Sequence, residues 1–334
     1  MRLFLIVIFL LLINNSNTFA QGCCSGGAGS PIAGGAATGV LQENQMEVSI
    51  NYQYNKSNKF FAENRDTNSL FNNLSSNYLF FRIDYGLSKK FTLSVASGYF
   101  LDKSKIGKYN DTISANGIGD LIIFPRYSIY NKTANFKRTA VVLGLGFKIP
   151  LGSHNDSTLV YSDEWIGDIY SLNPPMLQTT NGSNDFMFTS FLFREYQKSK
   201  LRFFISSLYV KKGFNSLGIK YGDYTSVSFF ASKTFFYRWG VTAQIKGEYI
   251  AKTRGYNDDL SNNSIYPEST GSKKWFFIPQ LSYSKNGITV FATSEIPLYQ
   301  YLNGTQVGSQ NQFTIGVNYR FLTKECEDPI PALN

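Results

Sequence analysis

Residues 46–54 read Met-Glu-Val-Ser-Ile-Asn-Tyr-Gln-Tyr, and this stretch decides the fold class. Every second side chain, from Met46 to Tyr54, is apolar or aromatic, and polar side chains fill the positions between them. A strict period of two places these two sets on opposite faces of a β-strand. The stretch therefore predicts a strand with one apolar face and one polar face.

The same alternation recurs to the end of the chain, and we expect twelve strands. Three of them have strand composition but a blurred alternation, at residues 186–194, 226–234 and 288–296. The other nine are expected at residues 46–54, 79–85, 91–99, 121–129, 141–149, 201–209, 241–249, 275–283 and 313–321.

The connections between these strands alternate in length. The connections after the first, third and each later odd strand are long and polar: residues 55–76, 101–117, 152–184, 211–225, 251–273 and 298–311. The intervening connections are tight turns. This rhythm is typical of an antiparallel outer-membrane meander, with short turns on the periplasmic side and long loops outside. An even number of strands also returns both termini to the periplasmic side.

A soluble β-sandwich would show the same period of two, so it is the competing fold. Aromatic residues near the expected strand ends favour the membrane barrel, because they would form girdles at the two lipid interfaces. These residues are Tyr52, Tyr54, Tyr85, Tyr99, Trp275, Tyr283 and Tyr319. The sequence therefore predicts an all-β protein, a transmembrane antiparallel β-barrel of about 12 strands.

The two ends of the chain differ from this pattern. Residues 1–20 have a basic start, an apolar run and a small-residue end, which indicate the signal peptide of an exported protein. Residues 21–45 are rich in Gly and Ala and are expected to be a flexible periplasmic leader. The barrel is then expected over residues 46–321 and a periplasmic C-terminal tail over residues 322–334.

The composition excludes several classes of protein. The chain has 334 residues, a formal net charge of +9 and one His, so chemistry that needs two imidazoles in one chain is excluded. Its basic residues are scattered without a cluster, which argues against nucleic-acid binding. Aromatic residues make up 16% of the chain, which excludes a charged disordered protein.

Three cysteines leave alternatives open. Cys23 and Cys24 follow the expected cleavage site directly, and Cys326 lies near the C-terminus. Either the preceding residues form a weak lipidation signal, or one of the pair forms a disulfide with Cys326. No other soft ligand lies near the pair, so we expect no metal site there.

Several short motifs carry a resemblance. Thr314, Gly316, Tyr319 and Phe321 resemble the terminal-strand signal that the outer-membrane assembly machinery recognises, although the chain continues beyond it. Four further motifs resemble those of the Gram-negative outer-membrane family named for the meta-pathway of phenol degradation, whose members are regarded as transporters or channels. They are Tyr85-Gly86-Leu87-Ser88-Lys89, Gly117-Ile118-Gly119-Asp120 with Arg126-Tyr127, Lys148-Ile149-Pro150-Leu151-Gly152, and Ile296-Pro297-Leu298-Tyr299.

The sequence offers little for catalysis. His154 and Ser157 could be compared with the His/Ser pair of outer-membrane phospholipase, but they lie in a long polar loop where nothing orients them. We therefore expect no enzyme activity and no cofactor.

The inward-facing side chains are the remaining candidates for function. Six basic and four acidic side chains are expected there: Arg82, Arg126, Lys148, Arg202, Lys246 and Arg320, with Glu47, Asp84, Asp120 and Glu248. They either fill the lumen as a salt-bridged plug or line a pore that favours anions. Inward Phe80, Phe124, Phe204 and Phe276 would instead suit aromatic or other apolar solutes.

Together these patterns predict an outer-membrane channel or transporter that passes small, unidentified solutes by passive diffusion. The alternative is a non-transport barrel that acts as a structural or assembly partner of a periplasmic or surface complex. Membrane lipid and the assembly machinery are the expected partners in both cases.

Overall fold

The structure is a computed structural model that describes residues 39–165, 167–255 and 267–324. The expected signal peptide, Cys23, Cys24 and Cys326 lie outside the described residues. The limits expected for the leader, barrel and tail stay predictions.

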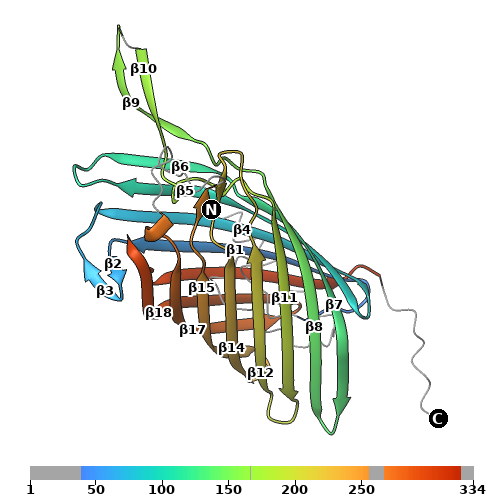
Figure 1. The fold of residues 1–334 in the computed structure, drawn as a ribbon. Helices are drawn as coiled ribbons and strands as arrows, with labels where there is room; N and C mark the ends of the chain where they lie inside the picture. The colour runs from blue at the N-terminus through green and yellow to red at the C-terminus, as the bar shows by residue number, and fades with distance from the viewer. Residues whose placement is uncertain (1–38, 166, 256–266, 325–334) are drawn as a thin grey trace, which may run out of the picture.

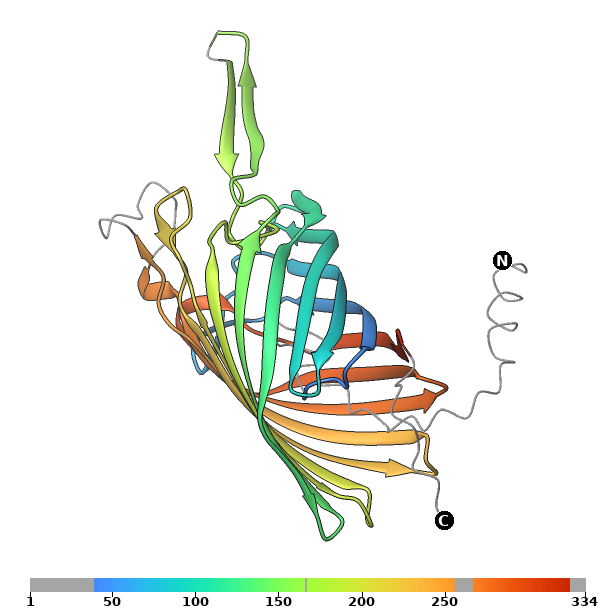
Figure 2. The ribbon, with the colours of Figure 1, turned by 90° about the vertical axis from the view of Figure 1, so that its right-hand side faces the viewer.

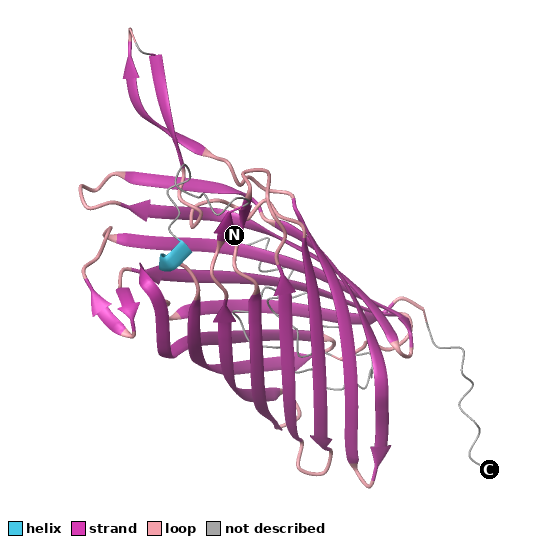
Figure 3. Cartoon of the chain, in the orientation of Figure 1, coloured by secondary structure: helices cyan, strands magenta, loops and turns pink. Residues whose placement is uncertain are grey.

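In the part of the chain that the structure describes, almost all regular structure is β-strand, apart from one short 3-10 helix, η2 (Pro267–Ser269) (Figure 3). Among the described residues no helix has the length and apolar character needed to cross a membrane. The strands are β1 (Gln45–Ser57), β2 (Phe60–Glu63), β3 (Arg65–Thr67), β4 (Asn73–Ser88), β5 (Phe91–Ile106), β6 (Thr112–Ile118), β7 (Asp120–Ala134), β8 (Lys137–Pro150), β9 (Ser157–Asp163), β10 (Gly167–Leu172), β11 (Asp185–Tyr196), β12 (Leu201–Lys211), β13 (Ile219–Lys220), β14 (Tyr224–Phe235), β15 (Trp239–Ile250), β16 (Arg254–Gly255), β17 (Ser272–Lys285), β18 (Ile288–Val307) and β19 (Gln312–Leu322).

Twelve of these strands close into an antiparallel barrel, which confirms the predicted fold class (Figure 1). Each barrel strand pairs with its neighbours in the chain, and β1 pairs with β19 to complete the ring. The ring order is β1, β4, β5, β7, β8, β11, β12, β14, β15, β17, β18 and β19. Every strand expected from the alternation is present, including the three with a blurred pattern.

The two ends of the barrel differ, as the connection lengths predict. One end, here called the short-turn end, carries tight turns at residues 89–90, 135–136, 197–200, 236–238 and 286–287. The other, the long-loop end, carries the long connections, which hold β2, β3, β6, β13, β16 and a hairpin of β9 and β10. Figures 1 and 2 show this hairpin standing away from the barrel.

The outer face of the barrel is apolar. Outward side chains on successive strands are exposed, such as Ile50, Ile83, Leu145 and Val227. A band of exposed apolar side chains around a closed barrel is the surface that lipid requires. The inward positions alternate with these and are mostly buried.

The described residues before β1 lie against the inner wall at the short-turn end. Leu41 N–H donates to Thr92 Oγ1 at 2.8 Å, and Asn44 N–H donates to the Gly86 carbonyl at 2.9 Å. Gly86 is required because a Cβ there would meet the Gln42 backbone. We call residues 39–44 the N-terminal strap.

Part of the long connection between β8 and β11 is buried at the opposite end. Leu177 is fully buried, and Gln178 and Thr179 are nearly so. The Gln178 carbonyl accepts a hydrogen bond from Lys103 Nζ at 2.6 Å, which ties this segment to β5. Side chains and chain segments therefore cover the inner wall at both ends of the barrel.

Candidate solute pathway inside the barrel

All ten charged lumen candidates from the sequence lie on inward positions of the barrel strands. Six of them are buried: Glu47, Arg82, Asp84, Arg126, Lys148 and Lys246. The other four are half-buried: Asp120, Arg202, Glu248 and Arg320. The structure gathers nine of the ten into three ion clusters and pairs the tenth, Arg202, with Glu195 at 3.0 Å.

The first ion cluster lies toward the short-turn end and joins β19, β1, β4 and β7. Arg82 contacts Glu47 at 3.1 Å and Asp84 at 2.7 Å. Arg126 contacts Asp84 at 2.8 Å, and Arg320 Nε donates to Glu47 at 2.8 Å. Three arginines against two carboxylates leave one positive charge here. The other terminal guanidinium nitrogen of Arg126, Nη1, donates to the Gly39 carbonyl of the N-terminal strap at 3.0 Å.

The second ion cluster lies at the long-loop end. Lys148 on β8 contacts Asp120 at 2.8 Å and Asp185 at 2.9 Å. Asp185 also contacts Lys212, in the loop after β12, at 3.0 Å. Burial, together with repulsion from Lys148, holds the pKa of Lys212 below its ordinary value. This cluster is compensated internally and fastens the loop to the barrel.

The third ion cluster joins β14, β15 and β18. Lys246 contacts Glu295 at 2.9 Å and Glu248 at 3.5 Å. The Tyr224 hydroxyl donates to Glu248 at 3.1 Å. The Lys246 ammonium also lies 4.5 Å from the centre of the Phe276 ring, so it is paired with two carboxylates and a ring face.

The inner face carries more charged groups than the sequence predicts. The barrel strands also turn Asp185, Glu195 and Glu295 inward, and they add the inward cations Lys103 and Lys274. Most of the inward charges are paired, so few of them are left to set up a field in the lumen. Four of the missed groups stand near strand ends or one residue beyond the expected limits, and Lys103 lies where β5 extends past its expected end.

One side of the lumen is aromatic and apolar. Val142 on β8, Phe191 on β11, Phe204 on β12 and Phe230 on β14 form a buried cluster that we call the aromatic wall. The rings of Phe191 and Phe204 stack with centroids 5.8 Å apart, and Phe204 meets Phe230 at the same distance. Val40 of the N-terminal strap packs against this wall.

The other side of the lumen is polar. Inward positions of β15, β17, β18, β19 and β1 carry mainly hydroxyl and amide side chains, although Phe276, Ile278 and Phe291 interrupt them. These polar residues include Ser49, Asn51, Thr242, Gln244, Gln280, Thr289, Thr293, Thr314 and Asn318. In the ring order, β8, β11 and β12 are each six strands away from β18, β19 and β1, respectively. The two sets of strands therefore lie on opposite sides of the lumen.

The residues of the expected assembly signal divide between the two faces of β19. Thr314 is buried on the inner face, with Gly316 two residues further on. Tyr319 is exposed on the outer face, and its ring stacks on that of Phe321 at 5.1 Å.

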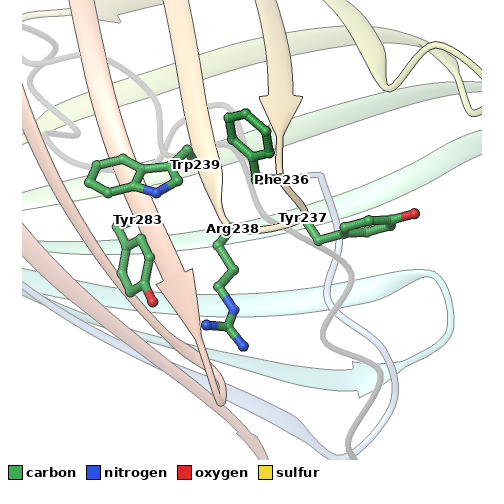
Figure 4. Close-up of a pocket in the computed structure, with 5 residues that line it drawn as sticks. All are labelled: Phe236, Tyr237, Arg238, Trp239 and Tyr283. Atoms are coloured by element: carbon green, nitrogen blue, oxygen red, sulfur yellow. The ribbon is translucent and has the colours of Figure 1, made fainter.

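A small hollow outside the lumen is also aromatic. It has a volume of about 400 Å³ and is lined by Phe236, Tyr237, Arg238, Trp239 and Tyr283 at the β14–β15 turn (Figure 4). Phe236 and Tyr237 are almost fully exposed, and Trp239 meets Tyr283 edge to face at 5.0 Å. Aromatic residues at this level are typical of a membrane interface.

The described residues around these walls form no catalytic constellation. His154 Nε2 lies 2.7 Å from Ser216 Oγ rather than near Ser157, and no carboxylate within the described residues orients the other ring nitrogen. The described residues hold no group of three or more potential metal ligands.

Comparison with known proteins gives the fold. No protein-family model and no curated protein matches the chain. Among solved structures, the COG4313 outer membrane channel from Pseudomonas putida F1 matches with a TM-score of 0.65 and 11% identity, over 86% of this chain and 98% of that chain. The NanC porin matches with a TM-score of 0.43 and 13% identity, over 82% and 98%. At this identity the first match shows the fold alone, which is that of an outer-membrane β-barrel.

Proposed function

We propose that this protein is an outer-membrane channel through which small solutes of low net charge diffuse passively. The observation that carries the proposal is the two-sided lumen, in which an aromatic wall faces a polar wall and most of the inward charges are paired. An uncompensated ring of one sign would select ions of the other sign. Paired charges weaken such a field, so solutes are sorted mainly by size and by contact with the two walls.

The outer face and the motifs support the same proposal. The exposed apolar band fits an outer membrane, where β-structure can span lipid only as a closed barrel. Members of the family that the four motifs resemble are regarded as transporters or channels, and we propose that family for this chain. No arrangement of the described residues favours an enzyme.

Swelling of liposomes that contain the purified full chain tests the solute class. We expect the neutral sugar glucose to enter faster than gluconate, an anion, or glucosamine, a cation, because the three solutes share a six-carbon skeleton and differ mainly in charge. Entry of either charged solute at the rate of glucose would contradict selection against charge.

A non-transport barrel is the second candidate, and the dense burial of the inward side chains favours it. Arg82, Phe204 and Lys246, which lie on different strands around the ring, are each only 2% exposed. In that case none of the three solutes enters, although the protein is folded in the membrane.

The terminal strand bears on how the barrel reaches the membrane. We propose that the assembly machinery recognises β19 through its outer aromatic pair. Replacing Tyr319 and Phe321 by Ser should lower the amount of heat-modifiable protein in the outer-membrane fraction several-fold. The same change at Phe236 and Tyr237, which are 86% and 84% exposed at a turn, is the control. Equal amounts of the two variants would contradict a role for the pair.

A further inference from the structure

Three adjacent strands of the polar wall carry buried side chains whose polar atoms have no hydrogen-bond partner within the described part of the chain. Thr293 on β18, Thr314 on β19 and Asn51 on β1 share this property, as does the side-chain carbonyl of Asn318 on β19. In Asn51 both the amide oxygen and the amide nitrogen are affected. We call these four residues the polar ladder.

The ladder is deeply buried. Asn51 is 0% exposed, Thr314 1%, and Thr293 and Asn318 5% each. Polar atoms removed from bulk water normally find a partner, because the desolvation cost is otherwise not offset. Four exceptions on neighbouring strands therefore need an explanation.

The strand register places the four residues in one continuous row. Thr293 lies directly opposite Thr314, and Asn51 lies opposite Gly316. A Cβ at Gly316 would meet the side chains of Asn51 and Phe291, so the glycine makes room for both. Asn318 follows two residues after Gly316, on the same face.

The row continues to the ion clusters at both ends. Toward the long-loop end, Gln312 lies opposite Glu295, and each has one polar atom without a partner in the described residues. Toward the short-turn end, Arg320 lies opposite Glu47. Between Gln312 and Arg320 the strand rises by roughly 27 Å, which is close to the height of about 25 Å of a lipid-facing band.

The chemistry of the ladder favours a neutral ligand with hydroxyl groups. Threonine hydroxyls and asparagine amides both donate and accept hydrogen bonds, as does a sugar hydroxyl. An ion would meet donors and acceptors mixed along the row, and none of the four ladder residues is ionisable. The aromatic wall faces the ladder across the ring and suits the apolar C–H face of the same molecule.

We infer that the polar ladder is the hydrogen-bonding track of the lumen, which binds water and the hydroxyl groups of small neutral polyols as they pass. This inference rests on the proposed channel function. It assigns the ligand class to one wall and names the residues that contact the ligand.

The test uses a substitution that keeps shape and removes the hydroxyl. Thr293→Val in the full chain should slow arabinose entry into liposomes by about threefold to tenfold, the loss expected for one hydrogen bond. Adding Thr314→Val should slow it further. The matched control is Thr225→Val, because Thr225 lies on the outward face of β14, between the buried inward residues Tyr224 and Ser226. We expect the control to leave arabinose entry unchanged.

A second measurement distinguishes two negative outcomes: that the polar ladder binds no ligand, and that the protein is not a channel. If water or solute binds the Thr293 hydroxyl, Thr293→Val does not raise the temperature at which the folded gel band is lost. If the site is dry, the apolar isostere relieves an unpaired buried group and raises that temperature. Unchanged arabinose entry together with a raised temperature would overturn the inference while leaving the channel intact. If arabinose does not enter liposomes that contain the wild type, the channel proposal fails. The direction of the temperature shift then decides by itself whether the polar ladder binds water.

Discussion

The two walls of the lumen are built on the same β-strand geometry, but they bury opposite kinds of side chain, apolar rings on one wall and polar groups on the other. The aromatic wall is complete in itself, because Phe191, Phe204 and Phe230 contact one another and leave nothing unpaired. The polar wall is complete only where charges pair, as at Glu47 and Arg320, and it leaves the polar ladder without hydrogen-bond partners among the described residues. The aromatic wall therefore stabilises the barrel, whereas the polar wall is the side that can bind what passes.

The largest effect is expected in the first ion cluster, which joins β19 and β1 of the polar wall to β4 and β7. Asp84→Asn removes the carboxylate that contacts both Arg82 and Arg126, and it leaves two buried guanidinium groups with less compensation. Breaking a buried ion pair in this way costs roughly 3–5 kcal/mol of unfolding free energy. Urea unfolding, followed by the shift of the folded gel band, measures it.

The control for this change is an ion pair at the surface. Glu268→Gln removes the partner of Lys252, and both side chains are largely exposed, so we expect no measurable change in stability. If Asp84→Asn were equally harmless, the first ion cluster would not be part of what holds the polar wall together.

A somewhat smaller effect is expected in the aromatic wall. Phe204→Ala removes a ring that is 2% exposed and stacks on Phe191, which should cost about 3 kcal/mol of stability. The space left should also raise the single-channel conductance. Phe229→Ala, on the lipid-facing side of β14 and 47% exposed, is the control and should change neither quantity strongly. Equal effects of the two variants would mean that the inward assignment of Phe204 is wrong.

The smallest effect is expected on ion selectivity. Lys274 points inward on β17 and contacts Ser309 Oγ at 2.9 Å, whereas its neighbour Lys273 points outward. Lys274→Glu changes the net charge of the inner face by −2, so the reversal potential in a salt gradient should move toward cation preference. Lys273→Glu should leave it in place. Identical shifts would show that selectivity is set outside the lumen.

The sequence predicts the polar wall better than the aromatic wall. In β1 and β19 the inner face is polar and the outer face apolar, so the period of two is plain in the residues. In β11 both faces carry large apolar side chains, with Phe191 inward and Leu192 outward, so the alternation is blurred. The strand itself was still predicted, because its composition and its place in the rhythm of turns did not depend on that contrast.

What the sequence could not predict depends on contacts between distant residues. Asp185 becomes part of an ion cluster only because β8 and the loop after β12 bring Lys148 and Lys212 to it. The N-terminal strap is held by Thr92 and Arg126, roughly fifty or more positions along the chain, and its Gly- and Ala-rich neighbourhood carries no periodic signal. The unpaired atoms of the polar ladder likewise follow from register across three strands, which no local pattern fixes.

Conductance of the purified full chain in a planar lipid bilayer would show directly whether the lumen conducts. We expect discrete current steps in potassium chloride, with a reversal potential close to zero in a salt gradient, because most of the inward charges are paired. The absence of any step from protein that migrates as a folded band would contradict a channel, and a reversal potential near that of a single ion would contradict the pairing of the inward charges.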